Sequence, residues 1–151
     1  MQPTIGQTAP SFRFKTPQGV WKSLEDYRGK TVVVYFYPKD ETPGCTKEAC
    51  SFRDHFTEFE KRDAVVLGVS ADDSASHQAF RTHHNLPFTL VPDPGGAIAQ
   101  SYGVYNESRK MAMRETFIVD PEGKVEKVFR DVDVDAHAQE VLDAIGTVAK
   151  R

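Results

Sequence analysis

Cysteine and tryptophan are scarce in this 151-residue chain, which contains two cysteines and one tryptophan. Two cysteines cannot build the dense disulfide framework of a small secreted protein. The longest apolar run covers residues 32–37, far short of the roughly 20 residues that a membrane-spanning helix requires. The first residues also lack the basic and apolar segments of a signal peptide. We therefore expect a cytoplasmic protein with no membrane partner.

A large excess of charge of either sign is missing as well. The chain has 19 Lys and Arg residues against 22 Asp and Glu residues, which gives a net charge of −3. This balance gives no reason to expect a nucleic-acid partner. Repeats, low-complexity stretches and linkers are not evident, and the length suits one hydrophobic core. The sequence thus predicts a single domain over residues 1–151.

What is present is an alternation of strand and helix patterns. Residues 31–37 are nearly all β-branched or aromatic, which is typical of a strand covered on both faces. The order of patterns predicts an α/β protein with a thioredoxin-like fold, in which an N-terminal hairpin precedes a mixed central sheet flanked by helices on both faces. The expected elements begin with a hairpin over 11–22 and strands over 31–37 and 64–70, with a helix between these strands whose apolar positions reach 59. A helix capped at 72–74 and running towards 84, a strand over 88–91 and a helical turn over 97–102 follow. The chain is expected to end with strands over 115–119 and 124–129 and a last helix from 133 or 135.

Cys45 lies in the first turn of the helix that follows the strand over 31–37. Thr42 fits the N-cap position, and Pro43 fits the first helical position. Cys45 also precedes Ala49 by four residues and therefore shares the inward stripe of the helix. The unpaired amides and the dipole at a helix start favour a thiolate, which is the reactive form of cysteine. The alternative interpretation is a small, buried and inert cysteine.

Cys50 follows five residues later, and this spacing raises a geometric question. Five residues of α-helix rise about 7.5 Å and turn about 140°, so the two Cα atoms would lie roughly 8.6 Å apart. A disulfide requires a Cα separation of about 4.4–6.8 Å. Cys50 can therefore pair with Cys45 only if this part of the helix unwinds. The alternative is an unpaired cysteine on a helix flank.

The segment Pro38-x-x-x-Thr42-x-x-Cys45 resembles the active-site motif of the peroxiredoxins. The longer run over residues 35–50 closely resembles the Q-type subfamily, also called bacterioferritin comigratory proteins. Shorter segments add to the resemblance: Gly29-Lys30, Val69-Ser70, Asp93, Tyr102-Gly103-Val104 and the run over 114–120. The resemblance implies a thioredoxin-like fold and a thiol-dependent peroxidase that reduces hydrogen peroxide and organic hydroperoxides.

The resemblance also implies a catalytic cycle that uses both cysteines. Cys45 would attack the peroxide and become a sulfenic acid, and Cys50 would then resolve it as an intramolecular disulfide. Thioredoxin or a similar dithiol would restore the two thiols. No metal, haem, flavin or other cofactor is expected in this cycle.

Four further residues receive roles from the resemblance. Thr42 would offer its hydroxyl to the peroxide, and Pro38 would shield the site from water. Arg114 would keep the thiolate charged, and Glu48 would orient Arg114. Each has a simpler alternative: a helix cap for Thr42, a strand end for Pro38 and a surface charge for Arg114 and Glu48. From the residues alone, Arg114 cannot be separated from two other arginines, Arg109 and Arg130.

Two competing functions remain open at this point. A thiol–disulfide oxidoreductase would have the same fold order, but it usually carries two cysteines separated by two residues. A metal-binding module could use Cys45, Cys50 and His55, although steps of five residues place these side chains on different helix faces. Of the other histidines, His77, His83 and His84 are interpreted as lying mostly on solvated faces, and His137 as opening the last helix. None of the four has a partner at triad or metal spacing in the sequence.

The segment over 105–113 looks shorter than in the subfamily, and Tyr105 stands where a tryptophan is common. This departure affects the expected substrate preference and any dimer contact near the segment. A monomer is expected, with a weak dimer as the alternative.

Overall fold

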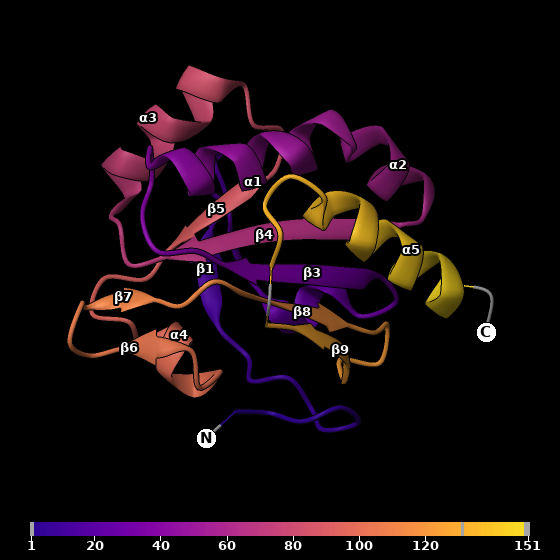
Figure 1. Ribbon diagram of the computed structural model, residues 1–151. Helices are drawn as coiled ribbons and strands as arrows, with labels where there is room; N and C mark the ends of the chain where they lie inside the picture. Colours follow the sequence, from indigo (N-terminus) through magenta and orange to yellow (C-terminus); the bar gives the residue numbers. More distant parts are fainter. Residues whose placement is uncertain (1, 131, 150–151) are drawn as a thin grey trace.

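The computed structural model describes residues 2–130 and 132–149. The central sheet consists of β3 (Thr31–Phe36), β4 (Ala64–Ser70), β5 (Thr89–Pro92), β8 (Glu115–Val119) and β9 (Val125–Phe129). Their spatial order is β5-β4-β3-β8-β9 (Figure 1). Strands β3, β4 and β5 are parallel to one another, whereas β8 is antiparallel to its neighbours β3 and β9. The thioredoxin-like arrangement predicted from the sequence is confirmed.

Helices cover one face of this sheet (Figure 1). They are α1 (Pro43–Asp54), α2 (Phe56–Lys61), α3 (Ser74–His84) and α5 (His137–Ala149). The core beneath them joins alternate β3 residues, such as Val33 and Tyr35, to Phe52 of α1, Phe80 of α3 and Ile145 of α5. Because side chains alternate along a strand, the remaining β3 residues face the opposite layer.

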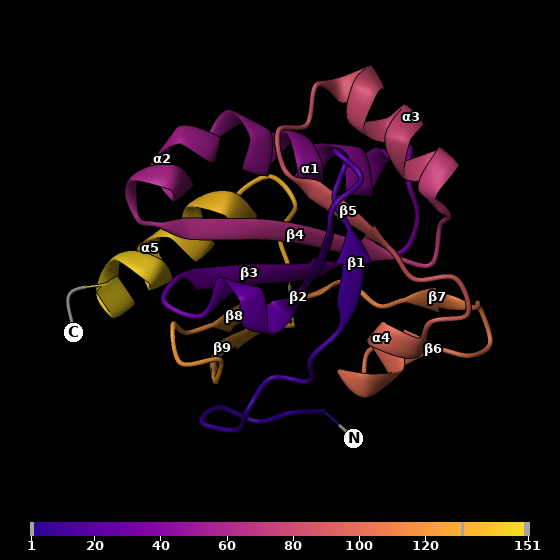
Figure 2. The ribbon, with the colours of Figure 1, turned by 180° about the vertical axis from the view of Figure 1, so that it is seen from behind.

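The opposite face is covered by shorter elements (Figure 2). They are β1 (Arg13–Lys15), β2 (Trp21–Ser23), the 3₁₀ helix η1 (Leu24–Tyr27), α4 (Ala97–Ser101), β6 (Tyr105–Asn106) and β7 (Met111–Ala112). Their core includes Phe14, Tyr102 and Val104, packed against Val34 and Phe36 of β3. With both faces covered, every residue of β3 is buried, and its sequence therefore lacks polar alternation.

Three details differ from the expected elements. The helix expected to reach residue 59 breaks at His55, which ends α1 and precedes α2. The hairpin β6–β7 was not predicted, because two-residue strands leave too short a pattern. The last helix begins at His137, not at Asp133 or Asp135. Its stripe includes buried Val141 and Ile145, whereas the side chain of Val148 lies outside the described part.

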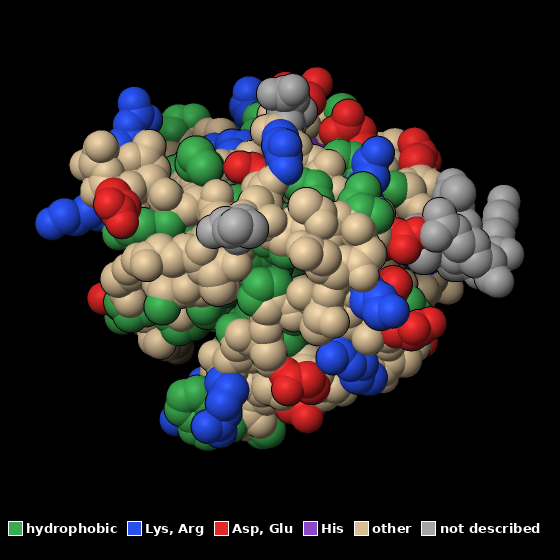
Figure 3. Space-filling view, turned by 90° about the horizontal axis from the view of Figure 1, so that it is seen from below, with side chains coloured by type: hydrophobic (Ala, Val, Ile, Leu, Met, Phe, Trp, Pro, Cys, Tyr) green, Lys and Arg blue, Asp and Glu red, His purple; other side chains and the backbone are tan. Residues whose placement is uncertain are grey.

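Two observations concern the surface. Across the described residues, no helix combines the length and apolarity needed to cross a membrane. On the face drawn in Figure 3, acidic and basic side chains are intermixed with hydrophobic ones, without a wide region of one charge. This face agrees with the small net charge of the whole sequence.

Candidate active site

The loop between β3 and α1 is anchored by a buried aspartate. Asp40 is 5% exposed, and its carboxylate accepts hydrogen bonds from the Tyr37 hydroxyl at 2.6 Å and the Ser76 hydroxyl at 2.8 Å. The Asp40 amide donates to the Asp72 carboxylate at 2.8 Å. These contacts connect the loop to α3 and to the segment after β4. They fix the position of the chain immediately before the cysteine helix.

His77 completes this anchor, in contrast to its interpretation from the sequence. It is buried, with Nδ1 2.7 Å from Asp40 Oδ2 and Nε2 3.1 Å from the carbonyl oxygen of Val91. The expectation of a solvated histidine is therefore wrong. The signal in the sequence was weak, because His77 precedes buried Phe80 by three residues on the inward stripe of α3.

Cys45 is the third residue of α1, as the cap pattern predicts, and it is 1% exposed. The Thr46 amide donates to the Thr42 carbonyl at 2.8 Å and closes the first turn. The amides of Gly44 and Cys45 therefore precede the helical ladder. The Thr42 hydroxyl does not cap the helix; it donates to the Lys39 carbonyl at 2.9 Å. Thr42 thus has the backbone of an N-cap without its side-chain bond.

Arg114, the residue immediately before β8, contacts the sulfur of Cys45. Its Nη2 lies 3.2 Å from Cys45 Sγ, and its Nη1 lies 2.7 Å from Glu48 Oε1. Burial acts to lower the pKa of Arg114, but the neighbouring Glu48 and Cys45 outweigh burial and raise it. The guanidinium therefore stays charged and donates a hydrogen bond to the sulfur. The two other arginines considered from the sequence lie elsewhere: Arg130 contacts Glu115 and Gln2, and Arg109 is exposed.

Glu48 is completely buried one turn after Cys45. Burial raises the pKa of Glu48 from 4.5 to about 7, although Arg114 acts in the opposite direction. Its second oxygen, Oε2, has no hydrogen-bond partner among the described residues and lies 4.0 Å from His137 Nε2. An unbonded carboxylate oxygen in the core adds to the cost of ionisation.

His137 lies behind Glu48 at the start of α5. It is fully buried, and its Nε2 lies 2.7 Å from the Thr116 hydroxyl. Burial lowers the pKa of His137 and outweighs the opposing effect of Glu140. The expectation that His137 opens the last helix is confirmed, whereas its burial was not predicted. Its burial depends on packing between α5 and the sheet, which no local pattern in the sequence shows.

Cys50 lies on the same intact helix as Cys45, and both are free thiols. Cys50 is half-buried, and so is Pro38 after the end of β3. Within the described residues, Cys45, Cys50 and His55 do not form a group with metal-binding distances. The hypothesis of a metal site at these three residues therefore has no geometric support. Since both cysteines are helical, the spacing argument against a direct disulfide applies to this state.

Comparison with known proteins gives a consistent result. Residues 5–128 match the model of the AhpC/TSA family. The chain is 40% identical to peroxiredoxin Bcp of Bacillus subtilis, over 97% of this chain and 98% of that protein. It is 44% identical to the chloroplastic peroxiredoxin Q of Sedum lineare, over 92% of this chain and 76% of that protein.

Solved structures resemble the fold over nearly its whole length. Peroxidoxin BcpB of Mycobacterium tuberculosis superposes with a TM-score of 0.88 at 32% identity, covering 97% of this chain and 99% of that one. The bacterioferritin comigratory protein of Xanthomonas campestris, solved in work on alkyl peroxide reduction, gives a TM-score of 0.87 at 33% identity. The match covers 97% of this chain and 99% of the Xanthomonas campestris chain.

Proposed function

The chain belongs to the AhpC/TSA family and is a thiol-dependent peroxidase, and from that premise we propose that Cys45 is its peroxide-attacking thiol. One observation carries this assignment: the 3.2 Å contact between Arg114 Nη2 and Cys45 Sγ. A buried sulfur beside a guanidinium and the first-turn amides of a helix has the surroundings of a reactive thiolate. Cys50 interacts electrostatically with Arg53, but the Arg53 guanidinium donates to Asp54 and His84 instead of to the sulfur, which supports a different role for Cys50.

The first half of the reaction breaks the O–O bond. The Cys45 thiolate attacks one peroxide oxygen, an S–O bond forms, and the other oxygen leaves as water or an alcohol after taking a proton. The sulfur is oxidised by two electrons to a sulfenic acid. Arg114 and the amides of Gly44 and Cys45 stabilise the charge that moves to the departing oxygen. The Thr42 oxygen, whose proton is directed to Lys39, is free to accept a hydrogen bond from the peroxide.

Two residues support this centre without touching the reacting sulfur. Glu48 holds the Arg114 guanidinium through its 2.7 Å contact and is therefore a positioning residue. Pro38 ends the strand that leads to the active-site loop, and we assign it the role of limiting access of water to the sulfur. Both assignments rest on the family resemblance together with the position of each residue.

The second half of the reaction changes the conformation. The Cys50 thiol attacks the sulfenic sulfur, water leaves, and an intramolecular disulfide forms after the helix between the two residues unwinds. A dithiol reductant then returns both cysteines to thiols, and a thioredoxin-type protein is the proposed partner. Solvent access to half-buried Cys50 is compatible with this step.

The remaining assignments are also proposals. We include organic hydroperoxides among the substrates, supported by the alkyl peroxide reduction studied in the Xanthomonas campestris relative. Residues 1–151 would act as a single thioredoxin-like domain, and the family match over 5–128 supports this interpretation. We propose that the protein is located in the cytosol, since reduced cysteines persist in that compartment. We also propose that it is a monomer.

Single-turnover kinetics of two cysteine variants test the proposal. Cys50→Ser is expected to consume one equivalent of hydrogen peroxide and to accumulate the Cys45 sulfenic acid, whereas Cys45→Ser should be inactive. After peroxide treatment, mass mapping of the natural protein should locate a Cys45–Cys50 disulfide within one chain. Equal loss of activity in both variants would instead favour a thiol–disulfide oxidoreductase.

A further inference from the structure

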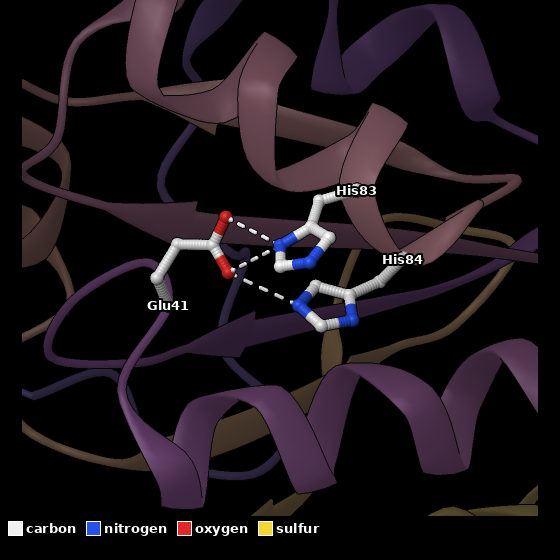
Figure 4. Close-up of side chains that lie close together, drawn as sticks. All are labelled: Glu41, His83 and His84. Carbon is white, nitrogen blue, oxygen red and sulfur yellow. Dashed lines mark hydrogen bonds and ion pairs between the residues drawn. The ribbon is translucent and has the colours of Figure 1, made fainter.

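A second cluster of ligand-type side chains lies at the entrance to α1 (Figure 4). His83 Nδ1 is 3.1 Å from both carboxylate oxygens of Glu41, and His84 Nε2 is 3.0 Å from Oε1 of the same carboxylate. Figure 4 shows the two imidazoles pointing from the end of α3 toward Glu41, which lies on the loop leading into α1. Glu41 and His83 are exposed and His84 is half-buried, so an ion in solution can reach all three.

The backbone on both sides holds this cluster together. Glu41 has a φ of 63°, a left-handed conformation that is uncommon for a residue with a side chain. Its neighbour Asp40 is fixed by the buried anchor described above. On the other side, α3 ends after His84 at Asn85, a C-cap with a φ of 52°. The two histidine rings lie with their centroids 4.2 Å apart.

Three donor atoms of this kind and separation suit a transition metal. In a tetrahedral site with metal–ligand bonds of about 2.0–2.1 Å, the donor atoms lie roughly 3.3 Å from one another. The nitrogen–oxygen distances at the cluster are 3.0–3.1 Å, so small side-chain rotations are enough. One potential ligand atom from each of Glu41, His83 and His84 lies within 4.8 Å of the other two. Imidazole nitrogen favours zinc, copper or nickel over magnesium and calcium, which prefer oxygen.

We propose that Glu41, His83 and His84 bind a divalent transition metal of the zinc type, and that the bound ion restrains the start of α1. On metal binding, each imidazole carries its proton on the ring nitrogen that faces away from the ion, and water completes the coordination.

The consequence for α1 follows from what contacts the end of α3. Glu41 precedes Cys45 by four residues, and Arg53 in the last turn of α1 donates to the carbonyl oxygen of His84 at 2.8 Å. The end of α3 therefore contacts both the segment before α1 and the last turn of α1. A metal between Glu41 and the two histidines strengthens the first contact and opposes unwinding of α1. This second part rests on the proposed function, in which that unwinding precedes disulfide formation.

Calorimetric titration with Zn²⁺ tests the site itself. The protein used carries Cys45→Ser and Cys50→Ser, so that no thiol contributes to binding and no peroxidase activity is needed. We expect one Zn²⁺ per chain and no binding of Mg²⁺. In this background, His83→Ala with His84→Ala should weaken Zn²⁺ binding at least about tenfold, and so should Glu41→Gln. His55→Gln is the control, since His55 lies outside the cluster, and it should bind as the parent does.

Rapid-quench mapping tests the effect on α1. In the natural protein treated with one equivalent of hydrogen peroxide, Zn²⁺ should slow the appearance of the Cys45–Cys50 disulfide at least about fivefold. The double histidine variant should form the disulfide at the metal-free rate of the natural protein, with or without Zn²⁺.

Three results would overturn parts of this inference. If the thiol-free protein does not bind Zn²⁺, or if the histidine and Glu41 variants bind it as tightly as their thiol-free parent, the site does not exist. If Zn²⁺ slowed disulfide formation equally in the natural protein and in the double histidine variant, the effect would come from Zn²⁺ binding to the thiols, and the restraint of α1 would be refuted. Absence of disulfide formation without metal would refute the proposed function and leave the calorimetric result valid.

Discussion

Arg114 has contacts on two sides, and its position depends on both. One nitrogen lies 3.2 Å from Cys45 Sγ, while the other lies 2.7 Å from Glu48 Oε1. A charge-assisted hydrogen bond of this type contributes about 1.5–3 kcal/mol. Since Glu48 is buried and fixed on the same helix as Cys45, the guanidinium has little room to move. Gly44, which precedes Cys45 on the helix, also lies beside the guanidinium.

Gly44→Ala is therefore expected to disturb the site without unfolding the protein. A Cβ atom at this position would lie 3.1 Å from Arg114 Nη2, the same nitrogen that donates to the sulfur, so the guanidinium must move by a few tenths of an ångström. We expect the second-order rate constant with hydrogen peroxide to fall roughly tenfold, equal to about 1.4 kcal/mol. Competition kinetics against a peroxidase of known rate measures this change. Lys47→Ala, on the exposed side of the same helix, is the control and should leave the rate unchanged.

The raised pKa of Glu48 leads to a second prediction, which concerns the pH dependence of the free energy of unfolding. The unfolded chain releases the Glu48 proton near pH 4.5, whereas the folded protein retains it up to about pH 7. Between these values the folded state binds more protons, so the stability from this group is complete below pH 4.5 and is lost as pH rises through 7. The free energy of unfolding should fall by on the order of 3 kcal/mol relative to Glu48→Gln over this interval.

Urea unfolding of both proteins at about pH 5, 6, 7 and 8 measures this difference. The comparison with Glu48→Gln cancels the titration of other groups that the two proteins share. A constant difference across the pH range would contradict the raised pKa of Glu48.

At the scale of elements, β4 shows how closely the strands and helices pack. Gly68 lies in the middle of β4, beside Tyr35 of β3. A Cβ atom there would lie 2.7 Å from Tyr35 Cζ and 2.9 Å from Leu90 Cδ2. The Tyr35 ring cannot turn away freely, because it stacks on Phe52 of α1 with centroids 4.7 Å apart. The missing side chain at Gly68 thus allows a tyrosine to lie between the sheet and the cysteine helix.

Gly68→Ala is expected to destabilise the fold by about 1–3 kcal/mol, the usual cost of overpacking a core. Chemical unfolding followed by circular dichroism measures this loss. Gly44→Ala serves as the matched comparison, because both variants add one methyl group at different positions. Gly44→Ala should mainly lower the peroxide rate, and Gly68→Ala should mainly lower stability. The opposite pattern would contradict the packing described for both glycines.

At the scale of the whole molecule, reactive and stable parts lie next to each other. The central strand β3 is buried on both faces, whereas α1 contains both cysteines and must unwind for them to pair. The proposed cycle therefore requires local opening of one helix above a sheet that stays folded. The buried anchor of Asp40 and His77 separates the two regions, since it holds the loop between β3 and α1.

Hydrogen exchange can detect this division of the molecule. After oxidation by peroxide, the amides over residues 45–50 should exchange at least about tenfold faster, equal to about 1.4 kcal/mol of local stability. The amides of β3 and β4 should exchange at unchanged rates. The reduced protein is the reference, and Cys50→Ser treated with peroxide is the control that cannot form the disulfide. Faster exchange throughout the sheet would contradict local unwinding.

The sequence by itself determined the elements with strong local signals. The strand over 31–37, the entry to α1 at Thr42 and Pro43, and the strand over 64–70 follow from composition and cap residues that act over a few positions. The thioredoxin-like order follows from the succession of these elements. The spacing of the two cysteines is also enough to make a disulfide between them incompatible with an intact helix.

Only the tertiary structure decided which distant residues meet. Arg114 is separated from Cys45 by 69 positions, and its proximity to the sulfur was implied by family resemblance alone. The sequence held only a weak signal for the burial of His77. It held none for the burial of His137 or for the meeting of Glu41 with His83 and His84. The physical reason is that helix caps and strand patterns depend on neighbours along the chain. The contacts of a polar side chain depend on how whole elements pack.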